Sequence, residues 1–128
     1  ELLGETADLT GAGTEFVWSI PDGSLTDKEK VELHACLREA LLNVRKHAKA
    51  TSVLVVGKPD GEGAYRCSVE DDGAGFDGDP LQAQGRFGLR MVRDRAKAMG
   101  WTFLAERRGG RTVVELGNIG RRTVRHER

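Results

Sequence analysis

Two β-hairpins, each preceded by one amphipathic helix, are the pattern that most limits the fold of this chain. Apolar periodicity near ~100° per residue predicts one helix from the capping box Thr26-Asp27-Lys28-Glu29 to about residue 48, and another over Leu89 to Met99, stopped by Gly100. Strands are expected at 15–20, 52–57, 64–71, 101–107 and 112–117. This order predicts a two-layer α/β sandwich, in which both helices cover one face of a mixed, mostly antiparallel sheet.

Charge and hydropathy exclude several classes of protein. Lys plus Arg and Asp plus Glu both number 20, so the net charge of zero argues against nucleic acid as a partner. No stretch of the sequence approaches the ~18 apolar residues of a membrane span, so we expect no direct membrane contact. Cys36 and Cys67 are expected to be free buried thiols in a reducing compartment. A cytoplasmic domain is therefore predicted, whether or not its parent protein is membrane-bound.

The 128 residues are enough for one ordinary domain. Because the chain opens at Glu1-Leu2-Leu3-Gly4, without Met, we expect a piece of a longer protein. Residues 1–14 are predicted to be the end of an upstream linker or helix, and 15–118 the domain itself. Residues 119–128 are locally basic and are predicted to be a solvated tail.

The first predicted helix carries a polar stripe beside its apolar one. Glu39, Asn43, Lys46 and His47 follow one another at i, i+4, i+7 and i+8, which puts them on one flank. The amide oxygen of Asn43 suits Mg²⁺, Lys46 and His47 can donate to phosphate oxygens, and Glu39 can polarise a water. The alternative is a charged, solvated flank held by i,i+4 pairs.

The strand before the central loop carries an acid on an apolar face. Tyr65, Cys67, Val69 and Asp71 alternate on one side of it. An isolated ionised carboxylate is costly there, so Asp71 needs a partner, and an adenine amine or a bridging water would serve. The alternative is a strand-end Asp that caps the following turn.

Glycine pairs flank the central loop, in Asp71-Asp72-Gly73-Ala74-Gly75 and in Gly85-Arg86-Phe87-Gly88. Glycine lets backbone approach a ligand closely, and the free N–H groups of the helix that Gly88 opens favour a phosphate. The chain has neither a Walker loop nor a dinucleotide fingerprint. A flexible surface loop is the alternative for either pair alone.

Three blocks in order carry a specific resemblance: Arg38-Glu39-Ala40-Leu41-Leu42-Asn43-Val44-Arg45-Lys46-His47-Ala48, Asp71-Asp72-Gly73-Ala74-Gly75-Phe76 and Gly85-Arg86-Phe87-Gly88-Leu89-Arg90-Met91. They resemble the N, G1 and G2 boxes of the ATPase superfamily shared by gyrase, the Hsp90 chaperone, histidine kinases and MutL. Wording and spacing are most similar to sensor histidine kinases of the nitrate-sensor and DesK type.

The resemblance implies the Bergerat two-layer fold, with ATP and Mg²⁺ bound. It implies that Asn43 coordinates Mg²⁺ and that Lys46 and His47 face the phosphates. Glu39 matches the position that activates water in the gyrase-like ATPases, and here it is expected to be a supporting acid/base or water-ordering group.

The resemblance also implies roles in holding the nucleotide. Asp71 would bind the adenine amine, in a pocket shaped by Gly73 and Gly75. The remaining positions implied to contact nucleotide are Gly85, Gly88, Leu89 and Thr112. The last hairpin departs from the family's Gly-Thr pattern, because it reads Gly109-Gly110-Arg111-Thr112.

The chain is expected to lack its own phosphoryl acceptor, because His34, His47 and His126 have no acceptor context. The resemblance implies a phospho-acceptor His on an upstream dimerisation domain of the same kinase, and a response regulator reached through the full-length protein. The fragment alone is expected to be monomeric. Two alternatives stay open: a protein-serine kinase of the anti-sigma-factor type, and a module that binds nucleotide without transferring phosphate.

Overall fold

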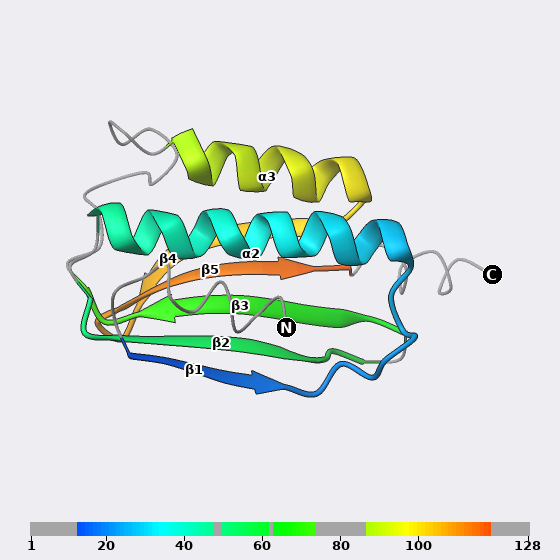
Figure 1. Cartoon of the computed structure of the whole chain (residues 1–128), viewed down its shortest axis with the longest axis horizontal. Coiled ribbons are helices and arrows are strands. Elements are labelled where there is room, and N and C mark those ends of the chain that lie inside the picture. Colours follow the sequence, from blue (N-terminus) through cyan, green and yellow to red (C-terminus); the bar gives the residue numbers. More distant parts are fainter. Residues whose placement is uncertain (1–12, 48–49, 62, 74–86, 119–128) are drawn as a thin grey trace.

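A five-stranded sheet with two helices along one of its faces forms the fold (Figure 1). The computed structural model describes residues 13–47, 50–61, 63–73 and 87–118, without the side chains of Lys46, His47 and Phe87. The elements in chain order are β1 (Gly13–Trp18), α2 (Asp27–His47), β2 (Ser52–Pro59), β3 (Tyr65–Asp71), α3 (Phe87–Met99), β4 (Thr102–Arg108) and β5 (Arg111–Gly117). The two-layer α/β prediction is confirmed.

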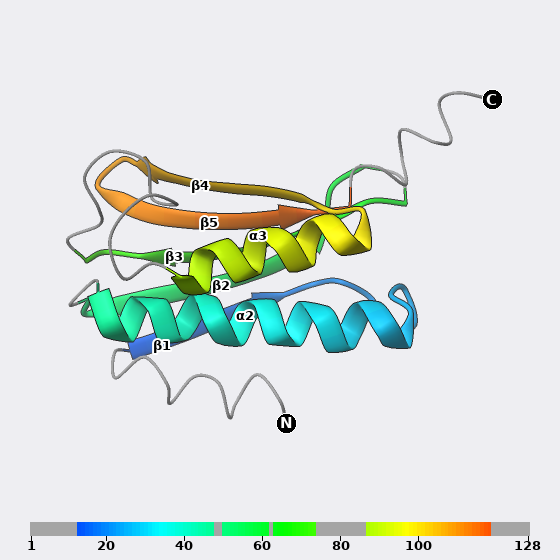
Figure 2. The same cartoon turned by 90° about the horizontal axis from the view of Figure 1, so that it is seen from above.

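The strand order is β1-β2-β3-β5-β4. β1 and β2 are parallel, whereas β2 with β3, β3 with β5 and β4 with β5 are antiparallel. A parallel neighbour requires a crossover, which α2 supplies between β1 and β2. The sheet is therefore mixed and mostly antiparallel, as the two hairpins predict, and both helices lie over the same face of it (Figure 2).

Helix α2 begins at the predicted capping box. The backbone N–H of Glu29 donates to Thr26 Oγ1 at 3.1 Å, and the backbone N–H of Thr26 donates to Glu29 Oε1 at 2.9 Å. These reciprocal bonds satisfy donors that the first helical turn would otherwise leave without partners. The apolar stripe of α2 then faces the sheet and α3.

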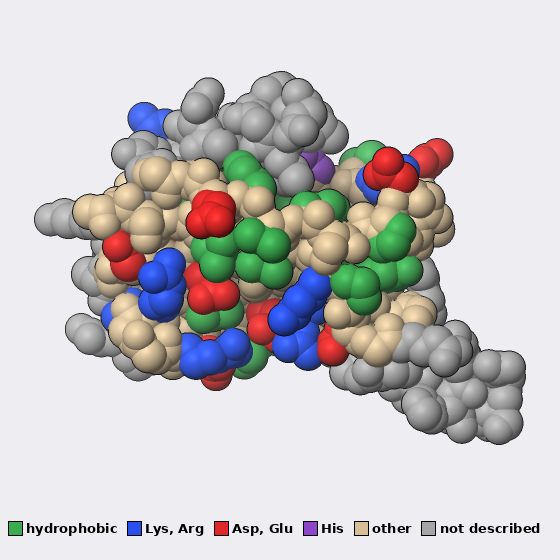
Figure 3. Space-filling view, turned by 90° about the horizontal axis from the view of Figure 1, so that it is seen from below, with side chains coloured by type: hydrophobic (Ala, Val, Ile, Leu, Met, Phe, Trp, Pro, Cys, Tyr) green, Lys and Arg blue, Asp and Glu red, His purple; other side chains and the backbone are tan. Residues whose placement is uncertain are grey.

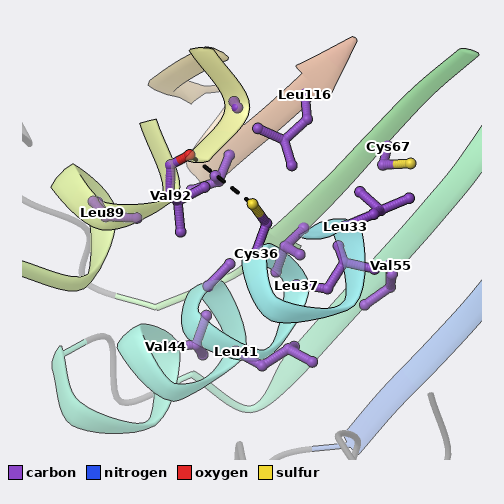
Figure 4. Packing of buried hydrophobic residues seen from close by; sticks show 14 of the residues in the cluster. Leu33, Cys36, Leu37, Leu41, Val44, Val55, Cys67, Leu89, Val92 and Leu116 are labelled. Carbon is purple, nitrogen blue, oxygen red and sulfur yellow. Dashed lines mark hydrogen bonds between the residues drawn. The ribbon is translucent and has the colours of Figure 1, made fainter. Parts of the chain in front are cut away.

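The core fills the space between the helices and the sheet (Figure 4). Leu41 of α2 and Leu89 of α3 are among its largest fully buried side chains. Truncating such a leucine to alanine typically costs about 2–5 kcal/mol, because a cavity remains. Cys36 and Cys67 are also in this core and are free thiols, as predicted. Burial raises the pKa of Cys36 to about 11 and that of Cys67 to about 12.

Helix α3 ends at Gly100, as predicted. Gly100 has φ +81°, the left-handed conformation that favours glycine. Its N–H donates to the carbonyl of Lys97 at 3.0 Å, and the N–H of Trp101 donates to that of Ala96 at 2.8 Å. This is a Schellman arrangement, which satisfies the last carbonyls of the helix and turns the chain into β4.

Some predicted boundaries were wrong by one or two residues. The first strand runs from Gly13 to Trp18 and not over 15–20, because its limits follow the parallel pairing with β2. The second helix begins at Phe87, two residues before Leu89. β4 begins at Thr102 because Trp101 belongs to the stop of α3. The ends of these elements depend on contacts between elements, which the local sequence pattern does not show.

The sheet face away from the helices carries charged side chains of both signs beside hydrophobic patches (Figure 3). Its ion pairs are Arg66 with Asp60 and Glu115, Arg108 with Glu106 and Glu115, and Arg111 with Glu70. Pairs this exposed typically contribute about 0–1 kcal/mol each. Within the described ranges, no helix is long and apolar enough to cross a membrane.

Candidate functional site

Three buried polar side chains, Asn43, Asp71 and Thr112, come from elements that meet at one end of the sandwich. Their exposed fractions are 8%, 3% and 5%. β3 ends beside the start of β5, since Asp71 pairs with Thr112, and the start of β2 lies beside the end of β3. The last turn of α2 and the first turn of α3 lie over the same end, at the left of Figure 1. We call this the site end.

Asp71 points to the helix-covered face, as its alternation with Cys67 and Val69 predicts, because both of those residues lie in the core. Its Oδ1 accepts a hydrogen bond of 2.9 Å from the backbone N–H of Gly73. A carboxylate offers about four acceptor positions, so it can accept from a ligand amine as well as from this turn. Strand alternation and a tight glycine turn thus hold a buried acceptor at the site end.

The next residue, Asp72, has a different task. It is exposed, and its carboxylate accepts from the backbone N–H groups of Ser52 and Thr51 and from the Thr51 hydroxyl, at 2.7–3.0 Å. The Ser52 backbone N–H and the two Thr51 donors lower the pKa of the Asp72 carboxyl well below its ordinary range. Asp72 therefore ties the start of β2 to the end of β3, outside the buried polar group.

Thr112 lies beside Asp71 on the same face, and Arg107 lies beside Thr112 on β4. The Arg107 Nη1 group donates to Thr112 Oγ1 at 2.8 Å and to the Gly73 carbonyl at 3.1 Å, and Nη2 donates to the Gly110 carbonyl at 3.0 Å. Sequence reasoning missed Arg107. Its only signal was hairpin register: around Gly109-Gly110, Arg107 pairs with Thr112.

Glu39 of α2 lies against the start of α3. A Cβ built on Gly88 would be 2.8 Å from Glu39 Oε2, so glycine lets the two helices approach here. The carboxylate is half-buried near the first turn of α3, where the helix dipole favours negative charge. Asn43 follows Glu39 one helical turn later and is buried. Of the polar flank predicted on α2, Glu39 therefore lies against α3, and Asn43 lies one turn further along the helix.

Of the other predicted site residues, the structure describes only some, and these lie in different surroundings. Gly73 is in the turn after β3, where its N–H bonds Asp71. Leu89 is fully buried in the core between the helices, so its side chain packs and presents no surface (Figure 4). Gly75 and Gly85 lie outside the described residues, as do the side chains of Lys46 and His47.

A cavity of about 270 Å³ lies away from these residues, beside the first half of α2. Its walls include Trp18 of β1, Leu25 of the connecting loop, and Leu33 and His34 of α2. Since it is at the opposite end of α2 from Asn43, it is not part of the candidate site.

The oxygen atoms of Asn43 and Glu39 suit a hard cation that is coordinated mainly by the phosphates of a bound ligand and by water. In the part of the chain that the structure describes, no cluster of three His, Cys, Asp or Glu side chains could hold a metal alone. Glu39 offers carboxylate oxygens near the start of α3, and the buried Asn43, one turn further along α2, offers an amide oxygen. Mg²⁺ usually takes one or two protein oxygens and fills its other positions with phosphate and water. These residues therefore fit a metal that arrives with a phosphate ligand.

Fold and site together define a class of protein, an α/β-sandwich domain whose buried hydrogen-bonding groups and helix N-terminus suit a nucleotide. Residues 28–119 match the model of the family described as histidine kinase-, DNA gyrase B- and HSP90-like ATPases. This match covers more than half of the chain. The chain therefore belongs to this family of ATPases, and the resemblance found in the sequence is confirmed.

The curated relatives include a nitrate/nitrite sensor protein and a histidine-protein kinase. The chain is 33% identical over 119 residues to the nitrate/nitrite sensor protein NarQ of Escherichia coli, covering 91% of this chain and 20% of the relative. It is 34% identical over 107 residues to the signal transduction histidine-protein kinase/phosphatase UhpB of Salmonella typhimurium, covering 83% and 21%. The chain thus spans about a fifth of the length of these curated relatives.

Solved structures agree on the fold. The histidine kinase domain of a blue-light activated histidine kinase from Erythrobacter litoralis matches with a TM-score of 0.74 and 20% identity, over 91% of this chain and 58% of that one. The mycobacterial sensor histidine kinase MprB matches with a TM-score of 0.66 and 14% identity, over 91% and 87%. In the family, this domain is the ATP-binding catalytic part.

Proposed function

We propose that this domain binds ATP together with Mg²⁺ at the site end, and delivers the γ-phosphoryl group to a His on a separate dimerisation domain of the same kinase. The observation that carries the proposal is the buried Asp71 carboxylate, facing the helix-covered side beside Thr112. A buried carboxylate is a strong hydrogen-bond acceptor with about four acceptor positions, and the exocyclic amine of adenine is a matching donor. Family membership and the named relatives support the same function.

The two halves of the nucleotide would be held by different elements. Asp71, Thr112 and the Gly73 turn, from β3 and β5, would hold the adenine. The phosphates would lie between the last turns of α2 and the start of α3, near Asn43, Lys46 and His47. Free backbone N–H groups at a helix N-terminus favour such an anion.

The chain's own contribution to transfer would be positioning. Asn43 would supply an oxygen to Mg²⁺, and the bound metal would neutralise charge on the phosphates. Glu39 would order a water or the incoming group beside Gly88. Phosphoryl transfer depends largely on such alignment and charge neutralisation, so a separately supplied His can serve as nucleophile.

The wider setting belongs to the proposal too. The domain, predicted over residues 15–118 and extended by β1 to Gly13, would follow a linker and precede the basic tail 119–128. The domain would work in the cytoplasm, as a monomer when isolated. A response regulator would receive the phosphoryl group through the full-length kinase.

The test supplies [γ-³²P]ATP and Mg²⁺ to the chain mixed with the parent's upstream helical domain. We expect label on the upstream domain that is acid-labile and alkali-stable, as for phosphohistidine. Alkali-labile label on Ser would favour a serine kinase. Binding of ATP with no transfer to the upstream domain would favour a module that only holds nucleotide.

The metal role is tested in the same mixture with Asn43→Ala. Because this variant removes the amide oxygen proposed for Mg²⁺, the gain in ATP affinity on replacing EDTA by Mg²⁺ should shrink, and transfer should fall. Arg45→Ala, two residues away on the exposed side of α2, is the matched control and should keep both. An undiminished Mg²⁺ effect in Asn43→Ala would remove Asn43 from the metal site.

A further inference from the structure

Arg107 joins two segments that border the proposed adenine site. One end of its guanidinium donates to Thr112 Oγ1 at 2.8 Å and to the Gly73 carbonyl at 3.1 Å, and the other donates to the Gly110 carbonyl at 3.0 Å. Asp71, Thr112 and Arg107 form one row across β3, β5 and β4. The residues one pair inward on the same face, Val69, Val114 and Ala105, are apolar and contact the core. The polar row is therefore the last at the site end.

The direction of the hydrogen bonds in this row follows from chemistry. A guanidinium has donors and no acceptor, so Thr112 Oγ1 must accept from Arg107. A hydroxyl has one hydrogen and two lone pairs, and because one lone pair accepts from Arg107, the hydrogen is directed away from Arg107 and can be donated to another neighbour. Asp71, when ionised, can only accept.

We propose that Arg107 is a positioning residue for the nucleobase, acting through Thr112, and that it makes the site selective for adenine over guanine. The inference rests on the proposed function, since it assigns the base to the Asp71–Thr112 pair. Arg107 itself need not touch the nucleotide. It orients the Thr112 hydroxyl as a donor and anchors the Gly73 turn, whose N–H holds the Asp71 carboxylate.

Adenine and guanine differ in the groups that would meet this pair. Adenine offers an amine donor next to a ring-nitrogen acceptor, which complements an acceptor at Asp71 and a donor at Thr112 when the contacts are direct. Guanine offers a carbonyl oxygen next to a ring N–H, the reverse pattern. Directing the Thr112 hydrogen toward the base therefore disfavours guanine, because the guanine carbonyl would face the Asp71 carboxylate and its ring N–H would face that hydrogen.

The experiment measures the dissociation constants of ATP and GTP, with Mg²⁺, by titration calorimetry on the full chain. Arg107→Ala should lower the preference for ATP over GTP by at least about fivefold, the size of one net hydrogen bond. Arg107→Lys, which retains a donor, should keep most of that preference. Arg108→Ala is the matched control, since Arg108 pairs with Glu106 and Glu115 on the opposite face, and it should leave the preference unchanged.

A double-mutant cycle separates orientation from general loosening of the site. Thr112→Val keeps the shape and removes the hydroxyl, so it should lower the preference as Arg107→Ala does. Adding Arg107→Ala to Thr112→Val should then change the preference little further. Equal weakening of ATP and GTP in Arg107→Ala, or full additivity in the cycle, would overturn the role of Arg107. Failure of the unaltered chain to bind ATP would instead overturn the proposed function.

Discussion

The two ends of the sandwich use buried polar groups in different ways. At the far end, around Tyr65 and Asn118, they bond the backbone of the fold itself. Asn118 Oδ1 accepts from the Tyr65 N–H, and the Asn118 N–H donates to the Tyr65 carbonyl at 3.1 Å. At the site end, Asp71 and Thr112 lie side by side on the helix-covered face of the sheet.

Because the two ends differ in this way, we expect substitutions to change stability and ligand binding separately. Groups at the far end complete the pairing of strand ends, so their loss should lower stability and leave ligand binding alone. Asp71 and Thr112 at the site end lie on the face proposed to bind the nucleotide, so their loss should weaken binding more than stability. Native proteins commonly keep residues that function requires even where those residues lower stability.

Asp71→Asn should have the largest effect. The substitution keeps the shape of the side chain, removes its charge and turns an amide N–H₂ toward the proposed adenine amine. Hydrogen bonds to charged groups contribute about 1.5–3 kcal/mol, so the dissociation constant of ATP should rise about ten- to hundredfold. Titration calorimetry measures it, and equal affinity in variant and wild type would remove Asp71 from the site.

The neighbouring acid gives the matched control. Asp72→Asn should leave ATP affinity within about twofold, because Asp72 holds Thr51 and Ser52 outside the buried row. It should lower the melting temperature at neutral pH. Since the pKa of Asp72 is lowered on folding, its stabilisation is present above the ordinary value of 3.8 and is lost as the pH falls through the folded value. The difference in melting temperature should therefore shrink in acid.

Asn118→Ala removes a hydrogen bond at the far end and is expected to lower stability. It leaves the Tyr65 N–H without its side-chain acceptor, at a cost of about 1–3 kcal/mol in the free energy of unfolding. Urea denaturation measures this loss, and calorimetry should give an unchanged ATP affinity. A variant that loses ATP affinity as strongly as Asp71→Asn would show that the two ends are not independent.

Local rules predicted the elements at both ends. The capping box of α2, the stop at Gly100 and the inward side of Asp71 each follow from a few adjacent residues, and the structure has all three. Arg107 could not be predicted in this way. Its contacts depend on the register between β4 and β5 and on the course of the turn at Gly73, which are long-range properties.

Resemblance went further than local rules, because it proposed which residues contact the nucleotide. The structure places Thr112 beside Asp71 and the side chain of Leu89 in the core. It also places Asp71 and its neighbour Asp72 on different faces, as the pleat of a strand requires. The site is thus predictable as a set of segments, and the side chain that acts in each segment depends on which face it takes.

Two glycines, Gly57 towards the far end and Gly88 at the site end, should respond differently to substitution by alanine. A Cβ at Gly57 would run into the ring of Trp18, a bulky group, so Gly57→Ala should cost about 1–3 kcal/mol of stability by overpacking. A Cβ at Gly88 would meet only the movable carboxylate of Glu39. Gly88→Ala should therefore change stability by less than about 1 kcal/mol, helped by the helix propensity of alanine.

The functional readout should reverse the order of the two glycine variants. Displacing the Glu39 carboxylate should slow phosphoryl transfer severalfold in Gly88→Ala, while Gly57→Ala should transfer normally at a temperature where it is folded. Single-turnover labelling of the upstream domain measures both rates. Normal transfer in Gly88→Ala would mean that the position of Glu39 beside α3 has no part in the reaction.

The smallest expected effect is the contribution of the two buried thiols, in the core between the two ends, to the pH dependence of stability. Burial raises the pKa of the Cys36 and Cys67 thiols to about 11 and about 12, against 9.0 for an ordinary thiol. Only the unfolded chain then loses these protons near pH 9, so their full contribution is present below that pH and is lost as the pH rises toward the folded values. Linkage gives about 0.4 kcal/mol per thiol at pH 9.

The thiol effect can be isolated from other titrations by comparison with a Cys36→Ala, Cys67→Ala double variant. Urea denaturation from pH 8 to 9.5 should show a steeper loss of stability in the wild type than in this variant, because only the wild type carries the two buried thiols. ATP affinity should not follow that difference, since neither thiol lies in the polar row at the site end. Equal slopes would mean that the two thiols ionise as readily in the folded core as in the unfolded chain.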